Sequence, residues 1–125
     1  MKKLLTILLA TICLFALCAC GSNSDSNQED ETIKVGVVQT TQHPALDAAT
    51  QGFVDALKEN GITNVDVQNA SGESTNCSTI VGNFVADGVD LIMANATPAL
   101  QAASAATDTI PVLGTSITVY DVVLG

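Results

Sequence analysis

Hydrophobic and polar positions follow two alternating periods from residue 33 onward. Residues 33–38 (IKVGVV) form a short β-branched run, which is typical of a buried parallel strand. Three later runs that are rich in apolar residues, at residues 65–67, 89–94 and 110–113, are predicted to be strands as well. Between these runs, apolar residues recur at spacings of three and four, which predicts one apolar face on each of three helices. Strands that alternate with helices predict βαβ units, and therefore an α/β fold with a parallel sheet.

Each predicted helix has a start or stop signal beside its apolar stripe. Pro44 suits a first helical turn, and Gly61 and Gly88 are suited to the left-handed stops that end helices. Pro111 stands near the start of the fourth strand, where a missing N–H is tolerated. The expected core positions are Leu46, Ala49, Phe53, Ala56 and Leu57 in the first helix, Cys77, Ile80, Val81, Phe84 and Val85 in the second, and Ala99, Leu100, Ala103 and Ala106 in the third.

The first 19 residues have the pattern of an export signal. Lys2 and Lys3 precede an apolar run at residues 4–17, which is shorter than the roughly 20 residues that a spanning helix needs. The sequence LCAC, ending at Cys20, resembles the lipobox of bacterial lipoproteins. This resemblance predicts a signal peptide at residues 1–19 and a lipidated Cys20. The alternatives are a plain secretory signal or an uncleaved membrane anchor. Two acyl chains hold a protein on a membrane, where one alone is marginal.

Residues 20–32 are predicted to be a flexible tether, because no large apolar side chain is present there to offset the entropy cost of ordering. Residues 33–125 are then one small α/β domain. The sequence ends soon after a new apolar segment begins. We therefore expect a truncated product of a longer gene, and a naturally short domain is the alternative.

Charge and the rare residue types narrow the function. After residue 20 only Lys34 and Lys58 oppose 13 Asp and Glu, and so acidic a surface argues against nucleic acid. Cys77 is the only later cysteine and His43 the only histidine, so neither a disulfide nor a metal site is predicted. Cys77 is expected to be a buried small hydrophobe. The sequence contains no phosphate-binding glycine loop and no paired nucleophile and base, which predicts a protein that is not an enzyme and needs no cofactor.

Ligands of open parallel sheets bind at the carboxyl ends of the strands. The loops expected there are residues 39–43, 69–72, 95–98 and 114–116, which are rich in small and hydrogen-bonding side chains. We expect them to line one rim of a polar pocket. Thr97 is the predicted N-cap of the third helix, with Pro98 at its first position, and the positive end of such a helix attracts a carboxylate. The alternative is simply a well-capped helix.

Several of these segments together resemble a known family. HPALDA at residues 43–48, QNA at 68–70, ATPALQAA at 96–103 and SIT at 116–118 occur in order. The segment from Ile33 to Thr118 is similar to the N-terminal lobe of ABC transporter substrate-binding lipoproteins of the tryptophan/tyrosine-uptake type. The resemblance implies a three-layer, parallel-sheet lobe of a type I periplasmic-binding-protein fold. This chain supplies one lobe, and after SIT it continues with VYDVV, where the family commonly has an early Asp.

The resemblance also implies a function. The protein would be the extracytoplasmic solute-binding component of an ABC importer, anchored to the cell membrane by its lipid. It would deliver a small solute, expected to be an amino acid such as tryptophan or tyrosine, to a permease and its ATPase. The ligand-binding positions carried over from the family are Gln39, Thr40, His43, Asn69, Ala70, Ala96, Thr97, Thr115 and Ser116.

Two other functions remain open at this point. A membrane-tethered sensor or adhesin lobe would share the same export signal and fold. A receiver or flavodoxin-like signalling domain would also share the fold, but it would need clustered acids or a phosphate-binding loop after residue 38, and residues 39–43 have neither.

Overall fold

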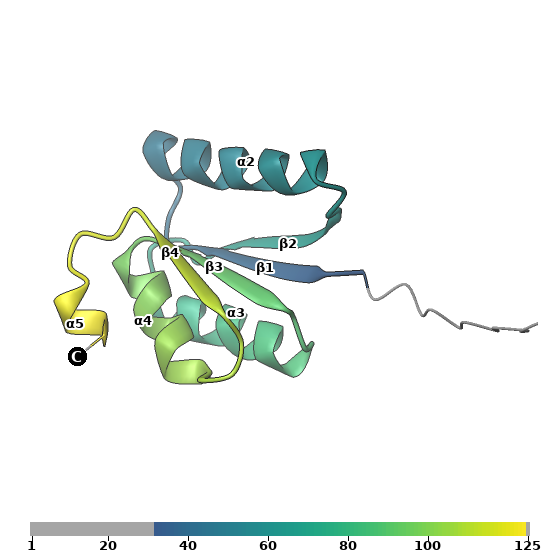
Figure 1. Ribbon diagram of the computed structural model, residues 1–125. Coiled ribbons are helices and arrows are strands. Elements are labelled where there is room, and N and C mark those ends of the chain that lie inside the picture. The colour runs from purple at the N-terminus through teal and green to yellow at the C-terminus, as the bar shows by residue number, and fades with distance from the viewer. Residues whose placement is uncertain (1–31, 125) are drawn as a thin grey trace, which may run out of the picture. The chain divides into compact units, whose positions relative to one another are not determined.

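The computed structural model describes residues 32–124 of the 125-residue chain (Figure 1). The predicted signal peptide, the lipidation site at Cys20 and the tether up to residue 31 lie outside the described residues. Within the described part, no helix is long and apolar enough to cross a membrane.

Four strands alternate with helices along the chain. The elements are β1 (Lys34–Gln39), α2 (Pro44–Glu59), β2 (Asn64–Asn69), α3 (Ser74–Ala86), β3 (Leu91–Asn95), α4 (Thr97–Ala106), β4 (Val112–Thr115) and α5 (Asp121–Leu124).

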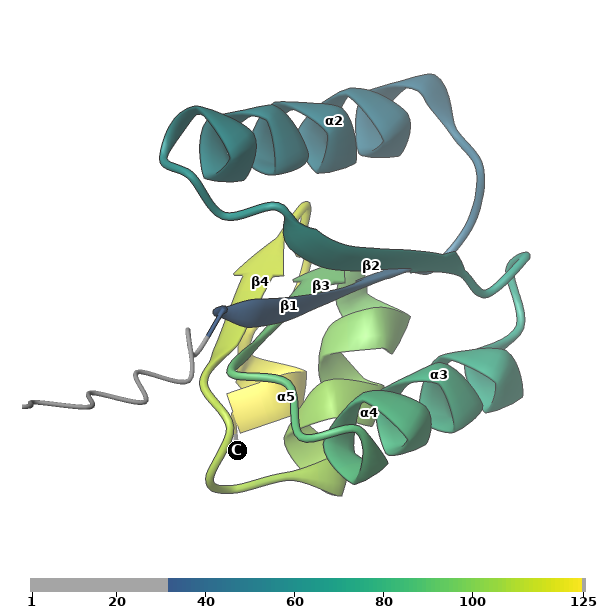
Figure 2. The ribbon, with the colours of Figure 1, turned by 90° about the vertical axis from the view of Figure 1, so that its right-hand side faces the viewer.

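The strands form one parallel sheet in the order β2-β1-β3-β4. Helix α2 covers one face of this sheet, and α3 and α4 cover the other (Figures 1 and 2). The predicted α/β class with a parallel, three-layer arrangement is confirmed. The fourth strand begins two residues later than predicted and includes Gly114 and Thr115, so the prediction that these two residues lie in a loop is wrong.

Side chains on alternate strand positions build two separate cores. Val35, Val37 and Met93 point toward α2, where Phe53 and Leu57 pack against them. The intervening strand positions point the other way, toward α3 and α4. That larger cluster contains the buried residues Val38, Ala70, Cys77, Val81, Phe84, Val89, Ile92, Ala94, Ala99, Leu100 and Ala103. The side chains of a central strand are buried on both faces of the sheet, so nearly all of them are apolar. This explains the apolar sequence of β1.

The predicted helix stripes are confirmed for α3, whose Cys77, Val81 and Phe84 are buried. In the other two helices, the predicted apolar stripe includes a residue that is exposed in the structure. Ala56 and Ala106 were predicted to be core residues but are exposed, whereas Thr50 and Val54 are the buried side chains of α2. Alanine carries little information about which face is buried, because its small side chain is tolerated on both. The predicted stops are confirmed, since Gly61 and Gly88 adopt φ values of 82° and 65° just beyond α2 and α3.

One glycine of β1 lets a helix approach the sheet closely. A Cβ atom at Gly36 would lie 2.6 Å from Cδ2 and 2.7 Å from Cγ of Phe84. Phe84 itself is 1% exposed, so its ring is enclosed by the core and rests on the bare backbone of the strand. The position of α3 on the sheet therefore depends on Gly36 having no side chain.

Candidate functional site

The carboxyl ends of the four strands form an aligned row of polar residues. The sheet register pairs Gln39 with both Asn69 and Asn95, and pairs Asn95 with Thr115. Each of these is the last residue of its strand. Their side chains follow the strand alternation onto the face of the sheet that carries α2. The expectation that four polar loops meet at one edge of the sheet is thus met by the geometry.

The nine predicted ligand-binding residues divide into two groups by exposure. Gln39, Thr40 and Ala70 are buried. The remaining six are exposed or half-buried and lie in or beside the loops: His43, Asn69, Ala96, Thr97, Thr115 and Ser116. The six can offer side-chain or backbone groups to a ligand, while the three buried residues support the loops from beneath.

The Gln39 side chain is held in an internal hydrogen-bond network. Its Oε1 accepts from Thr50 Oγ1 at 2.6 Å, and its Nε2 donates to Asp47 Oδ1 at 2.6 Å and to the carbonyl of Thr41 at 2.8 Å. Asn95 joins the same network, because its Nδ2 donates to Thr50 Oγ1 at 2.9 Å and to the Leu46 carbonyl at 2.8 Å. The network ties the ends of β1 and β3 to the first two turns of α2.

Thr40 and Ala70 connect the loops to one another. Thr40 Oγ1 donates to the Asn95 carbonyl at 3.1 Å and accepts from the Ala99 N–H at 3.3 Å. The Ala70 N–H donates to the Gln39 carbonyl at 2.9 Å, and its carbonyl accepts from Asn76 Nδ2 at 3.1 Å. These bonds fix the relative positions of the loops after β1, β2 and β3.

His43 and Asn69 have local roles in the backbone around them. His43 is the N-cap of α2, and its Nδ1 accepts from the Ala45 N–H at 3.2 Å. Asn69 Oδ1 accepts from the Ser71 N–H at 2.8 Å, which closes an Asx turn after β2. Both side chains remain exposed at the rim with their other polar atoms available.

The start of α4 differs from the prediction by one residue. Thr97 is not the N-cap: Ala96 occupies that position without a side-chain cap, and Thr97 is the first helical residue. The Thr97 hydroxyl lies 3.2 Å from the Thr118 hydroxyl and accepts from the Thr118 N–H at 3.3 Å. Pro98 has no N–H, and the Ala99 N–H is bound to Thr40. The groups of the first turn that could donate a hydrogen bond to an anion are therefore the Thr97 N–H and the Thr97 hydroxyl.

Ala96 stores backbone strain. Its φ of 82° and ψ of 161° lie in a region that is populated almost only by glycine. Ser71 and Ser116 also have positive φ, of 56° and 57°. All three residues are in loops that follow strand ends. The non-glycine residues with positive φ therefore lie at the carboxyl ends of the strands, next to the polar row. Such strain is characteristic of binding sites, where the surrounding structure holds the conformation in place.

Replacing Ala96 by glycine is expected to stabilise the protein by about 1 kcal/mol, because the relieved strain exceeds the entropy that glycine adds to the unfolded chain. The measurement is the free energy of unfolding in urea. The matched control is Ala56→Gly, at an exposed helical position of α2, which should cost about 1 kcal/mol. Equal losses in both variants would show that Ala96 is unstrained.

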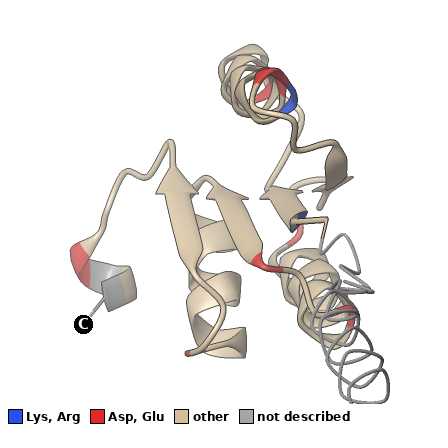
Figure 3. Cartoon of the chain, turned by 45° about the vertical axis from the view of Figure 1, so that its right-hand side comes forward, with Lys and Arg blue, Asp and Glu red and all other residues tan. Residues whose placement is uncertain are grey.

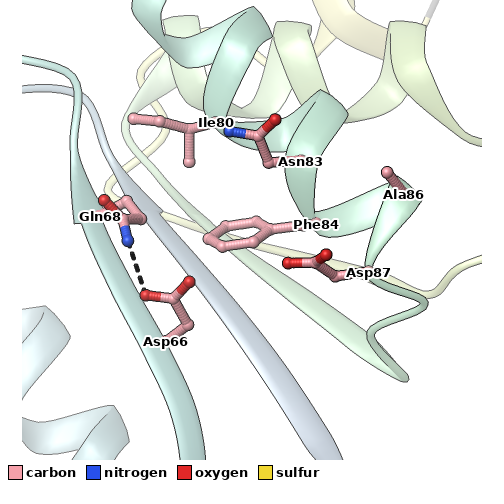
Figure 4. A pocket seen from close by; sticks show the side chains of 7 residues that line it. All are labelled: Asp66, Gln68, Ile80, Asn83, Phe84, Ala86 and Asp87. Atoms are coloured by element: carbon pink, nitrogen blue, oxygen red, sulfur yellow. Dashed lines mark hydrogen bonds between the residues drawn. The ribbon is translucent and has the colours of Figure 1, made fainter.

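Among the described residues, hollows are found on both sides of β2. One, of about 260 Å³, sits over the ends of β1 and β2 and is lined by Gln39, Gln42, Asp47, Thr50, Gln51, Val67 and Asn69. The other, of about 280 Å³, lies between the edge strand β2 and α3 and is shown in Figure 4; its lining is Asp66, Gln68, Ile80, Asn83, Phe84, Ala86 and Asp87. Gln68 Nε2 donates to Asp66 Oδ1 at 2.8 Å along β2, at the strand side of this hollow (Figure 4). Only the first hollow includes predicted ligand-binding residues.

Titratable groups of the described residues are few and spread out. Figure 3 shows the acidic residues dispersed over helices and loops, and no group of three or more potential metal ligands occurs in the described part. Cys77 is completely buried on α3, as predicted. Burial raises the pKa of its thiol above the ordinary value. The thiol is accordingly neutral, and it packs as a small apolar group.

Three members of the network under the rim are not among the residues that the sequence predicted for the site. Asp47 and Thr50 were not among the predicted site residues. Asn95 was named only as part of a loop. A signal for Thr50 was present, since it is a polar residue between the apolar positions Ala49 and Phe53 and so lies on the buried side of α2. Its partners could not be found from spacing, because Asn95 is 45 residues away along the chain.

Comparisons with known proteins show which family the chain resembles. Residues 34–123 match the family described as ABC transporter substrate binding protein. A tyrosine-binding protein of Clostridioides difficile is 35% identical over 94% of this chain and 38% of its own length.

The chain is also similar to solved structures, two of which are informative about function. The ligand-free, open structure of a substrate binding protein with adhesive properties from Clostridium difficile has a TM-score of 0.66 and 42% identity, covering 69% of this chain and 31% of that one. An ABC domain from Streptococcus pneumoniae in complex with L-Trp has a TM-score of 0.65 and 38% identity, covering 69% of this chain and 30% of that one. The chain thus spans about a third of the length of these relatives. It belongs to the ABC transporter substrate binding protein family.

Proposed function

We propose that this protein is the solute-binding component of an ABC importer and that it binds an amino acid, with tryptophan and tyrosine as the first candidates. The observation that carries the proposal is the aligned polar row Asn69, Gln39, Asn95 and Thr115, flanked by three strained loop residues. A relative named as a tyrosine-binding protein and a neighbour in complex with L-Trp support the ligand class.

In this proposal the six rim residues identified by exposure contact the solute. Thr97, at the start of α4, receives the carboxylate, because its N–H and hydroxyl lie at the positive end of the helix dipole. His43, Asn69, Thr115 and Ser116 contribute hydrogen bonds from the neighbouring loops. Gln39, Thr40 and Ala70 act from beneath the rim.

The proposed cellular setting follows from the first 20 residues. A lipid on Cys20 would hold the protein at the extracytoplasmic face of the cell membrane, next to a permease and its ATPase. The protein would bind and release its solute without a chemical step, metal or other cofactor. Labelling with radioactive palmitate tests the anchor: incorporation that is lost in Cys20→Ser supports it, and equal incorporation in both proteins contradicts it.

The test of ligand binding is titration calorimetry of the complete gene product with L-tryptophan and L-tyrosine. Thr97→Ala is expected to weaken binding about tenfold, the effect of one lost hydrogen bond to a charged group. The matched control is Thr109→Ala, an exposed threonine in the loop before β4, at the opposite end of the strands. Failure of the complete product to bind any of the common amino acids would refute the proposal.

Adhesion is a second candidate, because one structural neighbour is described as having adhesive properties. Solute binding and adhesion are separable by experiment. If adhesion is the function, the purified protein attaches to the surface of cultured cells, and Thr97→Ala leaves that attachment unchanged.

A further inference from the structure

The hydrogen-bond network under the rim crosses three elements that are far apart in sequence. Asn95 is at the end of β3, Gln39 is at the end of β1, and Thr50 lies in the second turn of α2. Thr50 Oγ1 is the junction, since it donates to Gln39 Oε1 and accepts from Asn95 Nδ2. A single hydroxyl therefore connects the two central strands through α2.

Gln39 uses both ends of its side-chain amide within this network. The oxygen accepts from Thr50, and the nitrogen donates to Asp47 and to the backbone carbonyl of Thr41. The bond to Thr41 matters most here, because Thr41 lies in the loop that leads into His43 and the start of α2. The amide thus holds one backbone carbonyl of the loop at the rim.

Asn95 is bound on one side only. Its Nδ2 makes two hydrogen bonds, whereas its Oδ1 is buried and has no partner in the described part of the chain. A buried acceptor without a partner is unfavourable, and an apolar side chain at this position would avoid that cost. What the Asn95 amide contributes is therefore geometry: it orients Thr50 and holds the Leu46 carbonyl.

We propose that Thr50 and Asn95 are positioning residues of the solute site, which act through the Gln39 amide to fix residues 40–43 and the first turn of α2 against the sheet. Both side chains are almost entirely shielded from solvent, Asn95 being fully buried and Thr50 8% exposed, and in this proposal they act from beneath the rim. This inference rests on the proposed function. It assigns a role to residues that lie outside the nine predicted contacts.

The test compares Thr50→Val, which keeps the shape and removes the hydroxyl, with Thr50→Ser, which restores it. In the complete gene product, Thr50→Val is expected to weaken binding of L-tryptophan or L-tyrosine about tenfold, and Thr50→Ser should recover most of this loss. The Gln39 side-chain amide protons, followed by nuclear magnetic resonance, should exchange with solvent at least about tenfold faster in Thr50→Val only.

Thr79→Val is the matched control, because the Thr79 hydroxyl bonds only to a carbonyl of its own helix on the exposed side of α3. It should change neither binding nor exchange at Gln39. Faster exchange at Gln39 together with wild-type affinity in Thr50→Val would overturn the positioning role. Unchanged exchange would show that Thr50 does not hold the amide. If the wild type binds no amino acid, the proposed function fails instead, and the exchange data report on the network separately.

Discussion

Gly36→Ala is expected to destabilise the protein by about 3 kcal/mol, the upper range for overpacking a core. The added methyl group would lie within 2.9 Å of three atoms of the Phe84 ring, and that ring is enclosed by the core. Either α3 must move away from β1 or the ring must leave its preferred rotamer, and both weaken the larger of the two cores. The measurement is the urea midpoint together with its slope.

Gly52→Ala is the matched control for this experiment. Gly52 lies in α2, and a Cβ there would meet nothing within 4 Å. The same substitution should therefore stabilise the helix by about 0.5–1 kcal/mol. The double variant Gly36→Ala with Phe84→Leu should be less destabilised than the sum of its single changes, because the smaller side chain relieves the clash. A neutral Gly36→Ala variant would contradict the close packing of α3 on β1.

Asn95→Asp is expected to cost about 3–5 kcal/mol at pH 7, although it changes only one atom of the side chain. The variant replaces the Nδ2 donor with a carboxylate oxygen facing the Leu46 carbonyl, in a site without solvent exposure. An unpaired buried charge is destabilising by this amount.

The loss should depend on pH in a defined direction. Burial raises the pKa of the new carboxyl group above its unfolded value of about 3.9. Relative to wild type, the variant is then most stable below about pH 4 and loses stability as the pH rises toward the folded pKa. Asn69→Asp is the control: its Oδ1 accepts from the Ser71 N–H at an exposed position, so a carboxylate should be tolerated within about 0.5 kcal/mol. Similar losses in both variants would show that the surroundings of Asn95 are not dry.

Much of the fold was predictable because it depends on local signals. The β-branched run of β1 and the apolar stripe of α3 led directly to a parallel sheet with helices on both faces. Gly61 and Gly88 marked two helix ends correctly. Alanine-rich stretches were less informative, so Ala56 and Ala106 were wrongly placed in the core, and the strand β4 was predicted two residues too early.

The position of the candidate site was predictable for the same reason. Parallel strands end at one edge of a sheet, so polar residues that follow apolar runs must gather there. Which of those residues are exposed at the rim and which are buried beneath it was not predictable. Gln39 and Thr40 are polar residues of the kind expected at the rim, yet their side chains are buried and bound to partners that lie up to 59 positions away along the chain.

The amino-acid sequence by itself determined the period of each element, the family and the edge at which the loops converge, because these follow from the order of apolar and polar residues along the chain. Only the tertiary structure decided that Asn95 and Thr50 hold Gln39, that Ala96 is strained, and that Phe84 rests on Gly36. Each of these depends on the register of the sheet and the distance of a helix from it. Both quantities are set by how all the side chains pack at once, and no local stretch of sequence specifies them.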